Sequence, residues 1–171
     1  MIDNRDSRGS VPESRNIVIK VEPATVNISP LGFHRYSSEF YDAAKSLETT
    51  ESYSPVPYYL YCHSLELALK AYLLAKGASK GSLKNKYGHD LEKSLHQAES
   101  FGLGNEFPLS SEERAHIALA NAHYKKKGFE YFDVSALVSG LKGQRKLPDL
   151  EVLDSLIESL LNGIKQTCLE A

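Results

Sequence analysis

The chain has 171 residues and a mass of 19.0 kDa, which suits one domain built around one hydrophobic core. Hydrophobic residues make up 42% of it and charged residues 25%, which excludes a wholly disordered, collagen-like or disulfide-stapled protein. With 20 Lys and Arg against 22 Asp and Glu, the formal net charge is -2. No overall positive field therefore attracts nucleic acid or an anionic membrane, and such binding would need a local patch.

The sequence also predicts where the protein works. The polar first residues contain no apolar segment of a secretion signal, and no apolar run reaches the roughly 18 residues of a membrane span. Cys62 and Cys168 lie far apart, without the paired spacing of a zinc site or of a redox motif, so we expect two buried, reduced thiols. We therefore predict a cytoplasmic protein with no membrane contact, no metal and no cofactor.

The first segments of the chain contain few residues that a hydrophobic core could bury. Residues 1–16 are polar and predict a flexible tail before a single domain over residues 17–171. Residues 17–21 are β-branched and end before Pro23, so we expect a short extended appendage there.

Apolar residues at steps of three and four then predict helices. The first follows Ser29 and Pro30, a capping pair, and is amphipathic. Its apolar positions are Phe33, Tyr36, Phe40, Ala43 or Ala44, and Leu47. After a break at residues 54–57, residues 58–76 predict a helix that is apolar on several faces, which places it at the centre of a bundle.

The second half of the chain predicts three more helices. A basic, glycine-containing loop over residues 78–88 leads to a shorter helix that Gly102 ends, and Ser110 or Ser111 begins the next. Residues 129–139 alternate in polarity and predict a possible small β element, although Asp133 could cap a short helix instead. Pro148 starts the last helix. The predicted fold is all-α, an antiparallel up-and-down bundle of four to five helices.

Three polar residues fall inside the most apolar helix. His63, Glu66 and Lys70 share one face at i, i+3 and i+7, where an unpaired charge would be costly. We favour a Glu66–Lys70 ion pair with a hydrogen-bonded His63, and a ligand or RNA contact is the alternative. A zincin motif would need a second His, which this helix lacks.

A second candidate lies at the start of the third predicted helix. Asp90 suits the N-cap, which alone would account for it. His89 adjoins a loop carrying Lys80, Lys84 and Lys86, and these cations beside free backbone N–H groups at a helix start suit a phosphate.

The best candidate site closes the fourth predicted helix, where Asn121, His123 and Tyr124 precede Lys125–Lys127 and then several aromatic residues. Lysines beside aromatics suit a phosphate backbone and unstacked bases, and a His there could act as an acid or base. We take His123, with Asn121, as the catalytic candidate, and Tyr124, Lys125 and Lys127 as ligand contacts. The alternative is a solvated lysine run that ends a helix, followed by core aromatics.

The run from His63 to Leu74, then Gly77, and then Gly88-His89-Asp90-Leu91, resembles the HEPN superfamily (higher eukaryotes and prokaryotes nucleotide-binding). The resemblance implies an up-and-down helical bundle that commonly forms a homodimer. Many such proteins are metal-independent endoribonucleases of toxin–antitoxin or other defence systems. Others are noncatalytic and serve in binding or assembly, some beside a nucleotidyltransferase partner.

The chain departs from the nuclease pattern of that superfamily, in which an Arg precedes a His by four to six residues. Arg114 is too close to His116 and too far from His123, although Lys125 or Lys127 could supply a substitute cation. Our leading hypothesis is therefore a noncatalytic, homodimeric bundle that binds a nucleotide, RNA or a protein partner. The alternatives are an atypical metal-independent endoribonuclease using His123 and a purely structural protein-interaction module.

Overall fold

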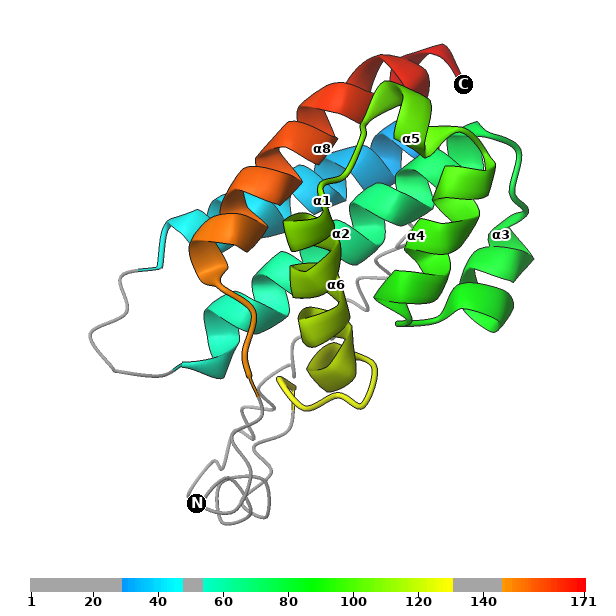
Figure 1. Cartoon of the computed structure of the whole chain (residues 1–171). Coiled ribbons are helices and arrows are strands. Elements are labelled where there is room, and N and C mark those ends of the chain that lie inside the picture. Colours follow the sequence, from blue (N-terminus) through cyan, green and yellow to red (C-terminus); the bar gives the residue numbers. More distant parts are fainter. Residues whose placement is uncertain (1–28, 48–53, 131–145) are drawn as a thin grey trace, which may run out of the picture.

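The structure, a computed structural model, describes residues 29–47, 54–130 and 146–171 (Figure 1). Within these ranges the chain is helical and has no strand, which confirms the all-α prediction. The predicted tail, the extended appendage and residues 131–139 of the possible β element lie outside them. The helices are α1 (Pro30–Lys45), α2 (Pro55–Ala75), α3 (Lys80–Ser82), the π-helical turn η1 (Leu83–Tyr87), α4 (Leu91–Ser100), α5 (Leu103–Glu106), α6 (Ser111–Tyr124) and α8 (Leu150–Glu170).

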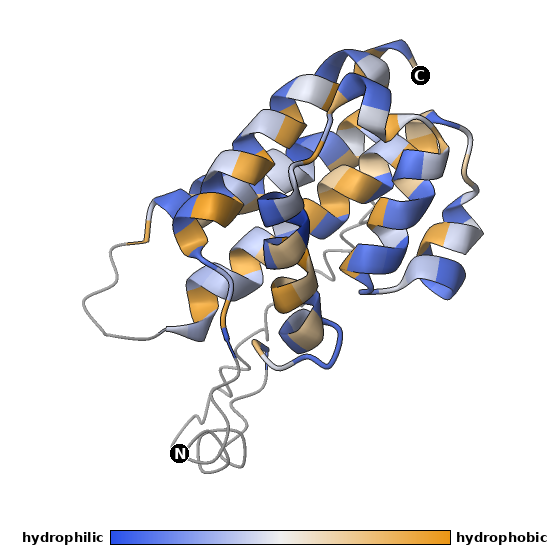
Figure 2. Ribbon diagram, in the orientation of Figure 1, coloured by the Kyte–Doolittle hydropathy of each residue, from blue (hydrophilic) through white to orange (hydrophobic). Residues whose placement is uncertain are grey.

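Helix α2 is the centre of the bundle, as its sequence predicts. It packs against α1, α4, α6 and α8, and its apolar residues lie on several faces (Figures 1 and 2). Its side chains Leu65, Leu69 and Leu73 are completely enclosed. From the other helices, the fully buried side chains include Leu91, Leu103, Ile117, Leu153, Leu156 and Ile157. None of the described helices is both long and apolar enough to cross a membrane.

Local capping fixes where the helices begin. Ser29 accepts a hydrogen bond from the Gly32 amide at the start of α1, and Ser110 forms a reciprocal capping box with Glu113 at the start of α6. The prediction of a break over residues 54–57 was wrong. Ser54 caps α2 and Pro55 lies in its first turn, where a proline has no hydrogen bond to lose.

The segment between α2 and α4 is more ordered than the predicted basic loop over residues 78–88. Gly77 leaves α2 with a φ of 92°, and Ser79 then caps the short helix α3, which continues into η1. Leu83 and Tyr87 anchor η1 in the core. Two buried side chains one turn apart make this segment a packed element, because burying them offsets the cost of ordering the backbone.

Helix α1 faces the core with a side that includes polar residues, His34 and Ser37, beside Tyr41 and Ala44. The Ser37 hydroxyl donates to the Ser64 carbonyl over 2.7 Å, and the Ser64 hydroxyl donates to the Ser37 carbonyl over 2.8 Å. His34 Nε2 donates a hydrogen bond of 2.9 Å to the Leu161 carbonyl. Of the predicted apolar positions, Ala44 is buried and Phe33 is partly buried against the core, whereas Tyr36 is 46% exposed. The helix is amphipathic as predicted, but the side that it turns to the core combines the polar His34 and Ser37 with Tyr41 and Ala44.

Candidate functional site

The carboxylate of Glu66 is the centre of a cluster formed by α2, α6 and the residue before α4. Glu66 is 2% exposed, and its Oε1 receives a hydrogen bond of 2.5 Å from the ammonium of Lys70, one turn later on α2. Its Oε2 accepts a hydrogen bond of 2.6 Å from the Tyr124 hydroxyl and lies 2.9 Å from His89 Nδ1. The carboxylate is therefore satisfied by three side chains from three parts of the chain.

These contacts keep Glu66 ionised. Burial by itself would raise the pKa of Glu66, but the Lys70 ammonium and the hydrogen bonds from Lys70, Tyr124 and His89 outweigh it, and the pKa lies below its ordinary value. Burial and the Glu66 charge together raise the pKa of Tyr124 far above 10, so the phenol keeps its proton. The cluster therefore has an ionised acceptor surrounded by donors.

The direction of these hydrogen bonds fixes the tautomers of two histidines. Since the ionised Glu66 can only accept, His89 donates from Nδ1, which leaves Nε2 as its unprotonated nitrogen when the ring is neutral. The Tyr124 hydroxyl gives its proton to Glu66, so His63 Nδ1, 2.9 Å away, donates to the phenolic oxygen. Burial lowers the pKa of His63, so that this ring is neutral near pH 7.

His63 and His89 differ in their access to solvent. The side chain of His63 is 22% exposed and is held between aromatic rings, edge to face with Phe40 and stacked on Tyr59. The side chain of His89 is 48% exposed. A carboxylate that orients an exposed imidazole through Nδ1 makes that imidazole suited to accept a proton or to hydrogen-bond a ligand.

A second set of polar contacts holds the start of α4 beside the end of α6. The buried amide of Asn121 accepts a hydrogen bond from the Leu91 amide and donates to Asp90 and Glu92. Asp90 also caps α4 by accepting from the Lys93 amide, and its other oxygen lies 2.5 Å from the Lys125 ammonium. The Leu91 and Lys93 amides are thus already bonded, so they are not the free phosphate-binding groups that the sequence suggested at this helix start.

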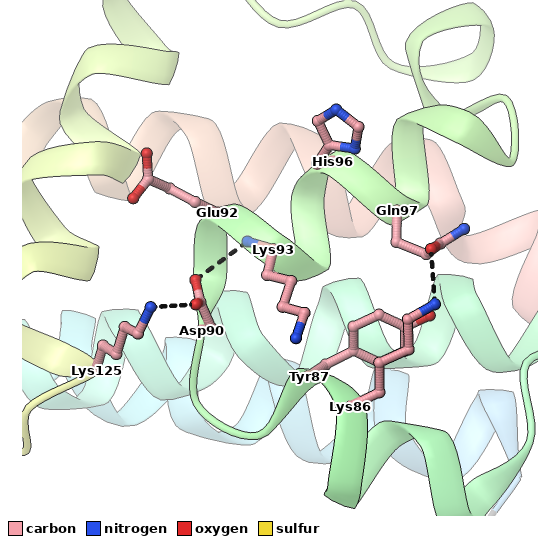
Figure 3. Close-up of a pocket in the computed structure, with 8 residues that line it drawn as sticks. All are labelled: Lys86, Tyr87, Asp90, Glu92, Lys93, His96, Gln97 and Lys125. Carbon is pink, nitrogen blue, oxygen red and sulfur yellow. Dashed lines mark hydrogen bonds and ion pairs between the residues drawn. The ribbon is translucent and has the colours of Figure 1, made fainter.

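A pocket of about 540 Å³ opens on the outer side of this junction (Figure 3). In Figure 3 the Lys93 side chain extends from α4 between Lys125 and Tyr87, and the Lys86 ammonium lies over the Tyr87 ring, 5.3 Å from its centre. Of its two acidic groups, Asp90 is bonded to Lys125, and Glu92 accepts from Asn121. The lining residues are Lys86, Tyr87, Asp90, Glu92, Lys93, His96, Gln97 and Lys125.

His123 lies apart from both groups of contacts. Its ring stacks on Phe129, and its Nε2 is 3.4 Å from the Lys146 carbonyl. Lys127 has a φ of 59° in the turn that follows α6, and its ammonium lies 3.6 Å from the Glu130 carboxylate. Neither residue lines the pocket.

The structure thus brings together most of the residues that the sequence singled out. His63, Glu66, Lys70, His89 and Tyr124 form one cluster. Asp90, Asn121 and Lys125 form the adjoining junction. The structure adds Lys93, His96 and Gln97 to the candidate residues; their spacing puts them near one another on the polar side of α4, but no sequence motif marks them.

The described residues contain no group of three or more His, Cys, Asp or Glu side chains placed to hold a metal ion. Comparisons with known proteins found no matching family model, no matching curated protein and no matching solved structure.

Proposed function

We propose that this protein is a helical-bundle binding protein whose ligand carries phosphate, as a nucleotide or a short stretch of RNA, in the pocket between η1, α4 and the end of α6. The observation that carries the proposal is the set of three ammonium groups along that pocket, from Lys86, Lys93 and Lys125. Its volume of about 540 Å³ falls among those of small-ligand sites, about 300–1,000 Å³.

The charges of the pocket favour an anionic ligand despite its two carboxylates. Asp90 is engaged by the Lys93 amide, Asn121 and Lys125, and Glu92 is engaged by Asn121. Among the residues that the structure describes, the Lys93 ammonium has neither an ion pair nor a hydrogen bond. A phosphate entering the pocket would meet this ammonium without first breaking an internal contact, which lowers the cost of binding.

The test is fluorescence anisotropy with a labelled oligouridylate, together with calorimetry on ATP, using the full chain at low salt. Lys93→Gln should weaken binding of the ligand at least about tenfold and should reduce the salt slope for RNA by about 0.7. Lys84→Gln is the matched control, because Lys84 is an exposed lysine of η1 that does not line the pocket.

Each outcome of this test is decisive. Binding of ATP but not RNA would identify a nucleotide site, and the reverse would identify an RNA site. Equal effects of the two lysine variants would show nonspecific electrostatic attraction and would refute the pocket as the binding site. Failure of the wild-type protein to bind either ligand at low salt would refute the proposed function.

A second candidate function is that of a metal-independent endoribonuclease, and the contact between Glu66 and His89 favours it. His89 Nε2 would take the proton of a ribose 2′-hydroxyl while the 2′ oxygen attacks the phosphorus. The bond to the 5′ oxygen breaks, and that oxygen leaves with a proton from water. The products are a 2′,3′-cyclic phosphate and a 5′-hydroxyl.

This geometry makes His89 a stronger acid–base candidate than His123, whose ring stacks on Phe129. The measurement is cleavage of an RNA pool in EDTA by the wild-type protein, by His89→Ala and by His123→Ala. Loss of cleavage in the His89 variant alone is expected for the nuclease. Loss of cleavage in the His123 variant alone would support His123 as the catalytic residue. No cleavage by the wild-type protein would refute the endoribonuclease function.

A further inference from the structure

The pocket between η1, α4 and the end of α6 has several charged groups but little open aromatic surface. Among the described residues that line it, only Tyr87 and His96 have rings. Tyr87 is 5% exposed, and the Lys86 ammonium lies over its ring, 5.3 Å from the ring centre. A nucleobase that stacks on a protein needs an open aromatic face, and the Tyr87 ring does not provide one.

His96 is exposed, but its ring lies apart from the ammonium groups of the pocket. In the view of Figure 3, the His96 ring and the Lys93 ammonium extend from α4 in opposite directions. A phosphate bound at Lys93 therefore does not bring the base of its nucleotide onto the His96 ring. The geometry of the pocket thus favours contacts with phosphate over contacts with a base.

Two ammonium groups of the pocket have no carboxylate partner among the residues that the structure describes. The Lys93 ammonium makes no internal contact, and the Lys86 ammonium donates a long hydrogen bond of 3.3 Å to the Gln97 side chain. Lys125, by contrast, is bound to Asp90. Lys86 and Lys93 belong to different elements, so one phosphate at Lys93 leaves the charge of Lys86 uncompensated, whereas a chain of phosphates can contact both.

We propose that the pocket recognises a chain of linked phosphates, such as the triphosphate of a nucleotide, and not the base attached to it. This inference rests on the proposed function and names its ligand class. One phosphate lies against Lys93, and another along the chain reaches Lys86, which gives up only its long hydrogen bond to Gln97. Each added phosphate brings negative charge to an ammonium that has no carboxylate partner, so the affinity should rise with the length of the chain.

The two lysines then have different roles. Lys93 contacts any ligand that carries a phosphate, so its loss should weaken the binding of all of them. Lys86 contacts only a ligand that has further phosphates, so its loss should affect polyphosphates alone. In a general positive patch, the two lysines would instead contribute equally to the binding of every anion.

The experiment is isothermal titration calorimetry of the full chain with ATP, GTP, AMP and inorganic tripolyphosphate, at low salt and in EDTA. GTP and tripolyphosphate should bind within about threefold of ATP, and AMP should bind at least about tenfold more weakly. Lys86→Gln should weaken the binding of ATP and tripolyphosphate at least about fivefold and that of AMP less than about twofold, whereas Lys93→Gln should weaken all of them. Lys84→Gln, at an exposed lysine of η1 outside the pocket, is the matched control and should leave every affinity unchanged.

Three results would overturn the inference and leave the proposed function in place. They are equal affinities for AMP and ATP, binding of RNA without binding of ATP or tripolyphosphate, and binding of ATP without binding of tripolyphosphate. The last result would show that the base or the sugar is recognised, and loss of ATP binding in His96→Ala would then identify His96 as the group that stacks on the base. A chain that binds neither RNA nor any of these phosphates would refute the proposed function itself.

Discussion

Replacing Glu66 with Leu should remove the centre of the polar cluster and destabilise the fold. The Lys70 side chain is 11% exposed, so its ammonium would remain in the core without its counter-charge. The Tyr124 hydroxyl would also lose its acceptor, whereas the half-exposed His89 would turn to water. Most of the loss of stability should therefore come from the unpaired Lys70 ammonium and from the Tyr124 hydroxyl that has no acceptor.

The magnitude follows from those two groups. Breaking a buried ion pair by removing one partner costs about 3–5 kcal/mol, and an unsatisfied buried hydroxyl costs about 1 kcal/mol or more. The variant should therefore lose about 4–6 kcal/mol of its free energy of unfolding, a large part of the 5–15 kcal/mol typical of a domain. The double variant Glu66→Leu/Lys70→Met should recover most of this loss, because it leaves no buried charge unpaired.

Urea unfolding followed by far-UV circular dichroism measures both variants. Glu158→Leu, at an exposed position of α8, is the control and should change the free energy of unfolding by less than about 0.5 kcal/mol. A cost below about 1 kcal/mol for Glu66→Leu would refute the reasoning, since it would show that the Lys70 ammonium is readily solvated. A double variant as unstable as the single one would refute the assignment of the cost to the unpaired lysine.

Three further predictions concern pH and local conformation. Burial lowers the pKa of His63 below 6.5, so the unfolded chain binds a proton that the folded chain does not, and stability should fall as the pH drops below 6.5. Urea unfolding across that range should show a smaller fall for His63→Asn. Ser110→Ala should remove the capping box of α6 and cost about 1 kcal/mol in the same assay. Gly102→Ala should lower the melting temperature by a few degrees, because Gly102 has a φ of 99°, where a Cβ costs about 1 kcal/mol.

The sequence predicted the helices well where local chemistry determines them. The serine caps of α1 and α6 and the apolar character of α2 are properties of neighbouring residues, and the structure confirms them. The face that α1 turns inward was not predictable in this way. That choice depends on the reciprocal hydrogen bonds between Ser37 and Ser64, which join residues 27 positions apart.

In the candidate site, too, the contacts between neighbouring residues were predictable and the contacts between distant residues were not. The spacing of His63, Glu66 and Lys70 on one helix is visible in the sequence, and the favoured Glu66–Lys70 ion pair is present in the structure. The contacts of Glu66 with His89 and Tyr124 span 23 and 58 positions, so only the packing of α6 against α2 creates them. Successive residues of a helix point about 100° apart, and so Tyr124 faces Glu66 while His123 faces Phe129.

The contact between His89 and Glu66 allows a structural role of His89 to be distinguished from a functional one. Lys70 and Tyr124 already satisfy the buried carboxylate, and a half-exposed imidazole adds little to stability because water can replace it. His89→Ala should therefore change the free energy of unfolding by less than about 1 kcal/mol. If the oriented imidazole serves a ligand at the adjoining pocket, the same variant should weaken nucleotide or RNA binding, or abolish cleavage, while remaining folded. A large loss of stability in this variant would show instead that His89 is part of the structural cluster, and its exposed nitrogen would then need no functional explanation.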